Sequence, residues 1–215
     1  MARSSNTEAR RAEITGALLA VIARHGYEKA TIQAIAAQAG LAPGLIHYHF
    51  RNKREILVSL IAEMSAAANA RYAAVLGDDV APAARLRAYL RARLGLGEGA
   101  APEIVAAWVM IGAEAVRQPE VRAVYQAMIA DELALLTALS RDCLRASGRA
   151  TGSAPTLAAG LAALISGAFQ LSSATTAVMP RGYAAPAAIA YAELAIAAAP
   201  ARRALRSTHG RPADR

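Results

Sequence analysis

Cysteine and aromatic side chains are scarce in this sequence, and their scarcity excludes several classes of protein. Cys143 is the only cysteine among 215 residues, which excludes a disulfide framework and a cysteine-rich metal site. The chain has one Trp, seven Tyr and two Phe. We therefore expect a protein of a reducing compartment that holds no metal and no cofactor.

Motifs of catalysis are missing as well. The sequence contains no nucleophile elbow, no phosphate-binding loop and no zinc-ligand spacing. Its four His residues, at positions 25, 47, 49 and 209, lie outside the central part of the chain, where a catalytic cleft would be. We predict no enzyme activity.

Long β-branched runs are absent, and alanine dominates the 55% of hydrophobic residues. This composition favours helix throughout. Apolar spacing, with Pro and Gly as breakers, predicts a disordered arm over residues 1–7 and a series of helices. The expected helices cover 8–25, two short segments within 31–50, 53–76, one from Pro82, one from Pro102, 119–147, 156–177 and 185–199.

No charged residue occurs between positions 150 and 179, a segment long enough to span a bilayer. Its polar residues and high Ala content argue against a membrane span, so we expect no membrane association. Gly160 and Gly167 are a heptad apart and predict a face that a partner helix can approach closely. The first residues lack the apolar core of a signal peptide, which predicts a cytoplasmic protein.

Positive charge is concentrated at the two ends of the chain. Residues 1–54 hold 8 Lys+Arg against 3 Asp+Glu, whereas residues 55–200 hold 11 against 12. The last fifteen residues hold 5 against 1 and are expected to form a basic, disordered tail over 201–215. A basic N-terminal part on a neutral remainder indicates that a polyanion binds at one end.

The segment 31–53 reads as two short helices joined by a tight turn. Thr31 is a candidate N-cap, Gly40 occupies the position where a helix ends in left-handed conformation, and Pro43 suits the first turn of the next helix. The second helix is rich in polar aromatics, with His47 and Tyr48 followed by a basic end. This pattern predicts a helix-turn-helix that reads a DNA major groove.

The same segment resembles the DNA-binding domain of the tetracycline-repressor (TetR) family. The resemblance covers about residues 8–65 and rests on Ile46-His47-Tyr48-His49-Phe50, on Arg51-Asn52-Lys53-Arg54-Glu55 and on Gly26-Tyr27-Glu28-Lys29-Ala30-Thr31. Two positions depart from the family pattern: Ala42 replaces the usual Ser or Thr cap, and His47 replaces the most frequent Tyr.

The resemblance, together with the residue types, implies a set of DNA-contacting residues. They are Thr31, Gln33, Pro43, Gly44, Leu45, His47, Tyr48, His49 and Lys53. Tyr48 is expected to reach bases or phosphates and Lys53 to bind a phosphate, whereas Phe50 is expected in the core. A metal role for the two His residues is the alternative, but positions two apart on a helix point in different directions.

The remainder of the chain resembles the C-terminal domain of choline-sensing BetI-type repressors. The match rests on Ala106-Ala107-Trp108, on Gln118-Pro119-Glu120-Val121 and on residues 161–167. The resemblance implies an inducer cavity, for which we expect Trp108, Tyr125 and Phe169 as walls and Gln170 as a polar anchor. The small number of aromatics argues against the aromatic cage that choline itself favours.

These observations predict an all-α protein with two domains. An N-terminal three-helix helix-turn-helix domain would cover residues 1–52, and a larger ligand-binding and dimerisation domain would cover 53–200. The expected function is a nucleoid-associated repressor that binds palindromic double-stranded operator DNA as a homodimer, paired through its last two helices, and is released by a small-molecule inducer. A constitutive DNA-binding protein or an activator without a ligand remains the alternative.

Overall fold

The protein is mainly helical in its described residues, which are 2–76, 78, 81–95, 102–175 and 177–202 of this computed structural model. Within them lie nine α-helices and one short 3-10 helix, η1 (Thr151–Ser153), and the β-pairing there is limited to an isolated bridge. The helices are α1 (Ala2–His25), α2 (Ile32–Ala39), α3 (Pro43–His49), α4 (Lys53–Leu76), α5 (Pro82–Leu94), α6 (Pro102–Arg117), α7 (Pro119–Ala146), α8 (Ala154–Ala174) and α9 (Ala184–Ala198). The all-α fold class is confirmed.

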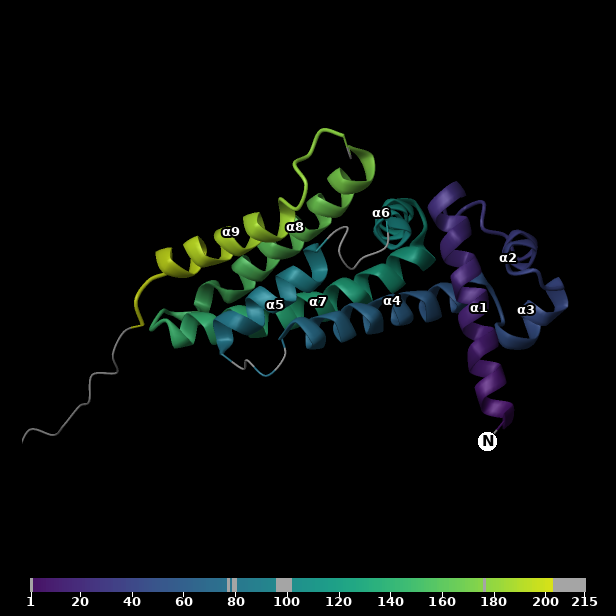
Figure 1. Cartoon of the computed structure of the whole chain (residues 1–215), viewed down its shortest axis with the longest axis horizontal. Helices are drawn as coiled ribbons and strands as arrows, with labels where there is room; N and C mark the ends of the chain where they lie inside the picture. Colours follow the sequence, from purple (N-terminus) through teal and green to yellow (C-terminus); the bar gives the residue numbers. More distant parts are fainter. Residues whose placement is uncertain (1, 77, 79–80, 96–101, 176, 203–215) are drawn as a thin grey trace, which may run out of the picture.

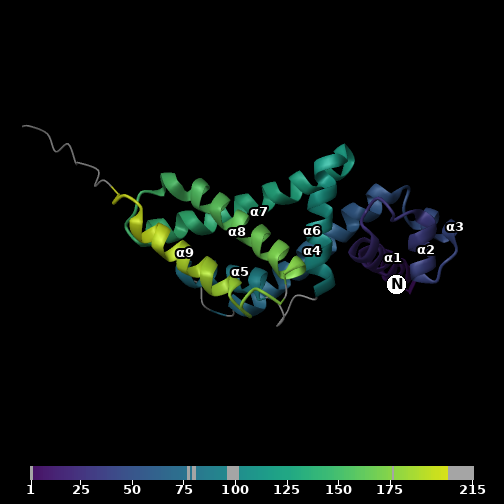
Figure 2. The ribbon, with the colours of Figure 1, turned by 90° about the horizontal axis from the view of Figure 1, so that it is seen from above.

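The molecule is elongated, with a small head at one end of a larger body (Figure 1). We call residues 2–52, which form α1 to α3, the head, and residues 53–202 the body. Helix α4 starts beside α1 in the head and runs along the body. Helices α8 and α9 lie side by side on the part of the body away from the head (Figures 1 and 2). The head is therefore held by one long helix and by the contacts around it.

The head is built on the apolar stripes that the sequence predicts. The apolar spacing predicts one buried stripe on each of α1 and α4, and the structure buries all of their residues: Ile14, Ala17, Leu18, Val21 and Ile22 on α1, and Ile56, Leu57, Leu60, Ile61 and Met64 on α4. Phe50 is 1% exposed and Ile46 fully buried, so the inner face of α3 packs into the same cluster. Burying one such side chain contributes about 1.5–3 kcal/mol, which explains how helices as short as α2 and α3 are held in place.

The core of the head continues into the body through α6. Ala107, Trp108 and Ile111 belong to the same buried cluster as the stripe of α1. A second cluster, formed by α5, α7, α8 and α9, holds the rest of the body together. Phe169 packs against both clusters. A shift of α6 or α4 would therefore displace side chains in the core of the head.

Two predicted boundaries are wrong. Helix α1 begins at Ala2 and not at residue 8, because residues 2–7 contain neither Pro nor Gly to stop the helix. Residues 200–202 are not frayed: Ala150 N–H donates to Pro200 O (2.8 Å) and Arg202 N–H to Gly148 O (2.9 Å). These bonds tie the chain after α9 to the turn between α7 and α8. The remaining predicted tail, 203–215, lies outside the described residues.

Helix α8 is long and apolar, and one of its faces is buried in the body. With η1 it spans Thr151–Ala174, long and apolar enough to cross a membrane by length and composition alone. Leu157, Leu161 and Ile165 are buried in the second cluster, as expected of a core helix. The close approach predicted at Gly160 is made by α9 of the same chain, because a Cβ there would clash with the Tyr191 hydroxyl.

Candidate nucleic-acid interface

The turn between α2 and α3 forms as its residues dictate. The Thr31 hydroxyl accepts a hydrogen bond from Ala34 N–H (3.1 Å), which confirms the predicted N-cap. Gly40 adopts φ 68°, a left-handed conformation in which its N–H and that of Leu41 satisfy the last carbonyls of α2. Pro43 opens α3, and Ala42 before it supplies no side-chain cap, as the sequence suggests.

Helix α3 has one buried and one open face. Ile46 faces the core, whereas Tyr48 is 80% exposed. The Tyr48 and His49 rings meet edge to face, with 5.0 Å between their centres. His47 is exposed and His49 half-buried. The other predicted contact residues in the turn and on the open faces of α2 and α3 are exposed too: Thr31, Gln33, Pro43, Gly44 and Leu45.

Lys53 differs from the predicted contact residues of α2 and α3 because its side chain binds the turn after α1. Its Nζ donates to Tyr27 O (3.0 Å) and lies 4.1 Å from the centre of the Tyr27 ring. Burial lowers the pKa of this ammonium group. The lysine therefore fastens the start of α4 to the turn after α1, and any phosphate contact would use its remaining donors.

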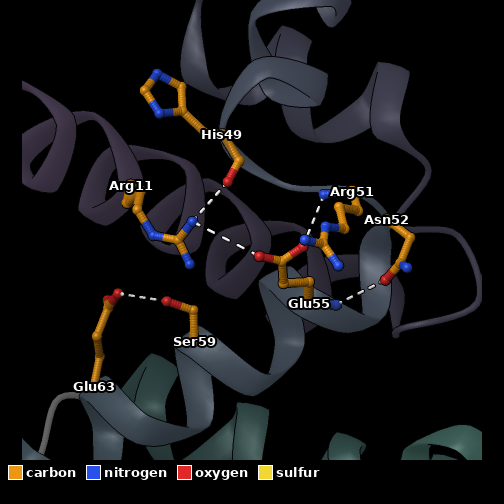
Figure 3. Close-up of polar contacts among 7 residues, drawn as sticks. All are labelled: Arg11, His49, Arg51, Asn52, Glu55, Ser59 and Glu63. Atoms are coloured by element: carbon orange, nitrogen blue, oxygen red, sulfur yellow. Dashed lines mark hydrogen bonds and ion pairs between the residues drawn. The ribbon is translucent and has the colours of Figure 1, made fainter.

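Arg11 of α1 clamps the end of α3, a role that the sequence pattern does not reveal (Figure 3). Its Nη1 donates to His49 O (2.6 Å) and lies 3.9 Å from Glu55 Oε1. The guanidinium also lies over the Phe50 ring, 3.9 Å from its centre. Because Arg11 and His49 are 38 positions apart, no local spacing signals this contact.

The connection between α3 and α4 is closed by reciprocal capping (Figure 3). Asn52 Oδ1 accepts from Glu55 N–H (2.9 Å), and Glu55 Oε2 accepts from Arg51 N–H (2.9 Å). Glu55 thus bonds the backbone before α4 while it pairs with Arg11 on α1. Further along α4, Glu63 accepts a hydrogen bond from the buried Thr15 hydroxyl of α1 (2.6 Å).

Three basic side chains and no acidic one line a hollow of about 300 Å³ on the head. The hollow lies between the end of α1 and α2, and Arg24, His25 and Lys29 line it together with Gln38. A polyanion that reached this part of the head would meet positive charge and hydrogen-bond donors. Their positions in the sequence do not show that these side chains line one hollow.

Three of the four residues predicted to bind a small molecule pack on one apolar cluster, and the fourth is exposed. Trp108 is 8% exposed and lies in the cluster shared with the head. Tyr125 and Phe169 are partly buried against that cluster, whereas Gln170 is exposed. None of the four lines the groove of about 360 Å³ that α4, α5 and α7 form in the described part of the body.

Metal ligands do not gather anywhere in the described ranges: no group of three or more His, Cys, Asp or Glu side chains could hold an ion there. The Cys143 thiol is buried and donates to Pro82 O (3.2 Å), and burial raises its pKa. The head itself presents exposed hydrogen-bond donors, aromatic rings and positive charge, which suit recognition of a partner.

A short helix with an open polar face, placed after a glycine turn on a basic head, defines a helix-turn-helix DNA-binding regulator. Residues 14–60 match the family model of bacterial regulatory proteins of the tetR family. Residues 82–206 match the model of the BetI-type transcriptional repressor C-terminal domain. The chain belongs to the TetR family of transcriptional regulators, with a C-terminal domain of the BetI type.

Individual relatives agree with this assignment. The chain is 33% identical to the HTH-type transcriptional regulator BetI of Rhizobium meliloti over 113 residues, which are 53% of this chain and 55% of that protein. The matched region thus spans about half of that relative's length. A transcriptional regulator from Rhodococcus sp. superposes with a TM-score of 0.73 at 23% identity, over 90% of this chain and 99% of the other. A regulator from Saccharomonospora viridis, crystallised in complex with choline, gives 0.68 at 23% identity, over 91% and 100%.

Proposed function

We propose that the protein is a ligand-responsive repressor that binds a palindromic operator as a homodimer and is released by a small-molecule inducer. The observation that carries the DNA-binding part is the open face of α3. Tyr48 is 80% exposed although Ile46, two positions earlier, is fully buried. A large aromatic side chain held in solvent by a well-packed helix is suited to contact a partner.

The contact residues that we propose are those named from the sequence, with different roles. Gly44 and Leu45 would let α3 approach the bases, with Leu45 meeting a thymine methyl, while His47 and Tyr48 would reach base edges or phosphates. Thr31, Gln33, Pro43, His49 and Lys53 would contact the sugar-phosphate backbone or groove edge. Arg11 joins them as a positioning residue, because it fixes the end of α3 from within.

Dimerisation through α8 and α9 is supported by the apolar surface that these helices expose. Leu194 is 71% exposed, and Leu164, Leu171 and Tyr191 are each exposed by 38–41%. Gly167 is also exposed, with open space where a Cβ would be. Helix faces of this kind are covered in stable homodimers. Two heads would then enter successive major grooves of one operator.

Release by an inducer is supported by the position of the groove in the body. One wall of the groove is α4, and the start of α4 carries Lys53 and Glu55, which hold the head. A ligand there would bias α4, and the shift could be only as large as its differential affinity for the two states. The choline complex of the Saccharomonospora regulator supports a small-molecule ligand for this chain too.

Selection of bound DNA from a random pool tests the DNA-binding part. We expect enrichment of a palindrome with half-sites about one helical turn apart, bound by the dimer and weakened steeply by salt. Enrichment of no sequence over random DNA would contradict an operator-binding function. A small molecule that raises the melting temperature and lowers operator affinity together would support induction, since linkage makes both effects reciprocal.

The alternative is a constitutive DNA-binding protein or an activator that needs no ligand. A broad metabolite screen without any compound that changes operator affinity would favour it. A fusion of the operator to a reporter gene would distinguish a repressor from an activator. Deleting the gene of this protein should raise reporter expression for a repressor and lower it for an activator. In either case we propose that the protein acts in the cytoplasm, where its operator is.

A further inference from the structure

The groove in the body combines an apolar lining with a carboxylate that can accept further hydrogen bonds. It lies between α4, α5 and α7 and has a volume of about 360 Å³. Its apolar lining comes mainly from α4 and α7 and consists of Val58, Ile61, Val124, Met128 and Leu135. A cavity of this size suits a small molecule with an apolar part.

The deep end of the groove is held by a buried cluster of polar groups. Arg93 Nη2 and Nε donate to Glu132 Oε1 at 2.6 and 3.0 Å, and the Tyr89 hydroxyl donates to the same oxygen at 2.8 Å. The side chains of Arg93 and Glu132 are only 11% and 8% exposed. These three donors fix the carboxylate in one orientation.

The second oxygen of this carboxylate is free to accept hydrogen bonds from a ligand. Oε2 of Glu132 receives no hydrogen bond from the described part of the chain, although Glu132 lines the groove. The neighbouring carboxylate of Asp131, at the rim, has no ion-pair or hydrogen-bond partner in that part either. Two carboxylates against the single cation of Arg93 leave the groove with a net charge of −1.

We propose that the groove binds a small amphipathic amine. Its protonated nitrogen would donate N–H bonds to Glu132 Oε2 and Asp131, and its apolar part would lie along α4 and α7. The ligand class follows from charge and donor balance, because both free groups can only accept hydrogen bonds when ionised. Ser65 and Asn69 on α4 add polar contacts along one wall.

The same geometry argues against a quaternary ammonium as the preferred ligand. Such a cation has no N–H to donate and depends on aromatic faces. Tyr89 is the only aromatic residue of the lining; it is 2% exposed and its hydroxyl is already bonded to Glu132. The inference rests on the proposed ligand-responsive function and names the chemistry of the ligand.

Four probes with one hexyl chain and different heads test the proposal on the full-length protein by titration calorimetry. They are n-hexylamine, hexanoate, 1-hexanol and hexyltrimethylammonium. We expect hexylamine to bind about tenfold or more tightly than each of the other three, the gain of one charge-assisted hydrogen bond. Equal affinity for hexanoate or hexanol would overturn the role of the carboxylates, and equal affinity for hexyltrimethylammonium would overturn the need for an N–H donor.

Variants locate the site. Asp131→Asn should weaken hexylamine binding about tenfold, and Ala127→Trp, at an exposed wall position, should block the groove. Glu103→Gln removes an exposed carboxylate of α6 outside the groove and serves as the matched control. Unchanged binding in both groove variants would overturn the proposed site. Operator affinity is measured in the same samples without probe. A protein that binds hexylamine but no operator would contradict the proposed DNA-binding function and leave the result on the groove unchanged.

Discussion

Tyr48 presents the largest freely exposed side chain of α3, and its replacement separates base reading from general attraction to DNA. If Tyr48 reads a base, Tyr48→Ala should narrow the gap between operator and random DNA by about 1–3 kcal/mol. Binding titrations with both DNAs measure this gap. Lys53→Ala provides the contrast, since loss of a phosphate contact should weaken both DNAs alike and lower the salt slope by about one.

An equal loss on operator and random DNA in Tyr48→Ala would contradict its base-reading role. The result for Lys53→Ala needs a stability measurement beside it. Lys53 bonds Tyr27 O and faces the Tyr27 ring, so the variant loses structural contacts of about 1 kcal/mol as well. Binding at a temperature well below the unfolding transition of the variant separates the two contributions.

Arg11 is predicted to act on DNA through α3 without touching phosphate. Its guanidinium is committed to His49 O, to Glu55 and to the Phe50 ring. Arg11→Ala should therefore lower the melting temperature and weaken operator binding, while the salt slope stays that of the wild type. A phosphate contact would instead lower the slope by about one.

Arg10→Ala is the matched control for Arg11, because the two arginines are neighbours with the same charge. Arg10 pairs only with Glu13 on the surface of α1, a contact of about 0–1 kcal/mol. We expect the control to leave the melting temperature nearly unchanged. Equal effects of both substitutions on stability and operator affinity would show that net charge, and not the clamp, determines the result.

At the scale of elements, the sequence predicts helices well where their end signals are local. The Thr31 cap, the Gly40 turn and Pro43 at the start of α3 act within a few residues, and the structure has each of them as expected. The start of α1 was misplaced because an absence of breakers is a weaker signal than their presence. The contacts of residues 200–202 with the 148–150 turn are long-range, and no local pattern encodes them.

Side-chain partners were predictable only where a motif specifies them. The exposed face of α3 follows from its amphipathic spacing, whereas the predicted phosphate role of Lys53 gives no sign of its bond to Tyr27 O. Gly160 correctly indicates a close approach, but a small residue does not specify that the neighbour is α9 of the same chain. Likewise, the groove residues Asp131 and Glu132 carry no sequence signal, since their role depends on three helices meeting.

Helix α6 connects the head and the body, and Trp108 tests how rigid this connection is. Trp108 is 8% exposed among side chains of the core that the head shares with α6. As a core residue, Trp108→Ala should lower the free energy of unfolding by about 3–5 kcal/mol. Chemical denaturation measures this loss, followed by circular dichroism because the variant has no indole. A loss below about 1 kcal/mol with normal operator binding and an altered inducer response would favour the predicted pocket-wall role instead.

At the scale of the whole molecule, two kinds of contact connect the head to the body. The strong ones are the shared apolar core, the continuous α4 and the hydrogen bonds of Lys53, Glu55 and Glu63 to residues of the head. The ion pair between Glu28 and Arg117 (3.7 Å) is well exposed and therefore contributes little. A ligand that displaced α4 would act through the strong contacts, which makes α4 the element through which groove and head would communicate.

Assembly is tested by Gly167→Glu on the exposed face of α8. Nothing lies within 4 Å of a Cβ built at Gly167, so the substitution should leave the fold of one chain intact. If α8 and α9 form the dimer interface, the added charges would face each other in an apolar contact and prevent pairing. We expect monomers in sedimentation and a large loss of operator affinity, because a single head loses the second half-site.

Gly16→Glu, at an equally open position of α1, controls for the added charge and should sediment as the wild type does. A wild-type protein that is already monomeric at micromolar concentration would contradict the proposed homodimer, and a Gly167→Glu variant that remains dimeric would place the dimer contact outside this face of α8.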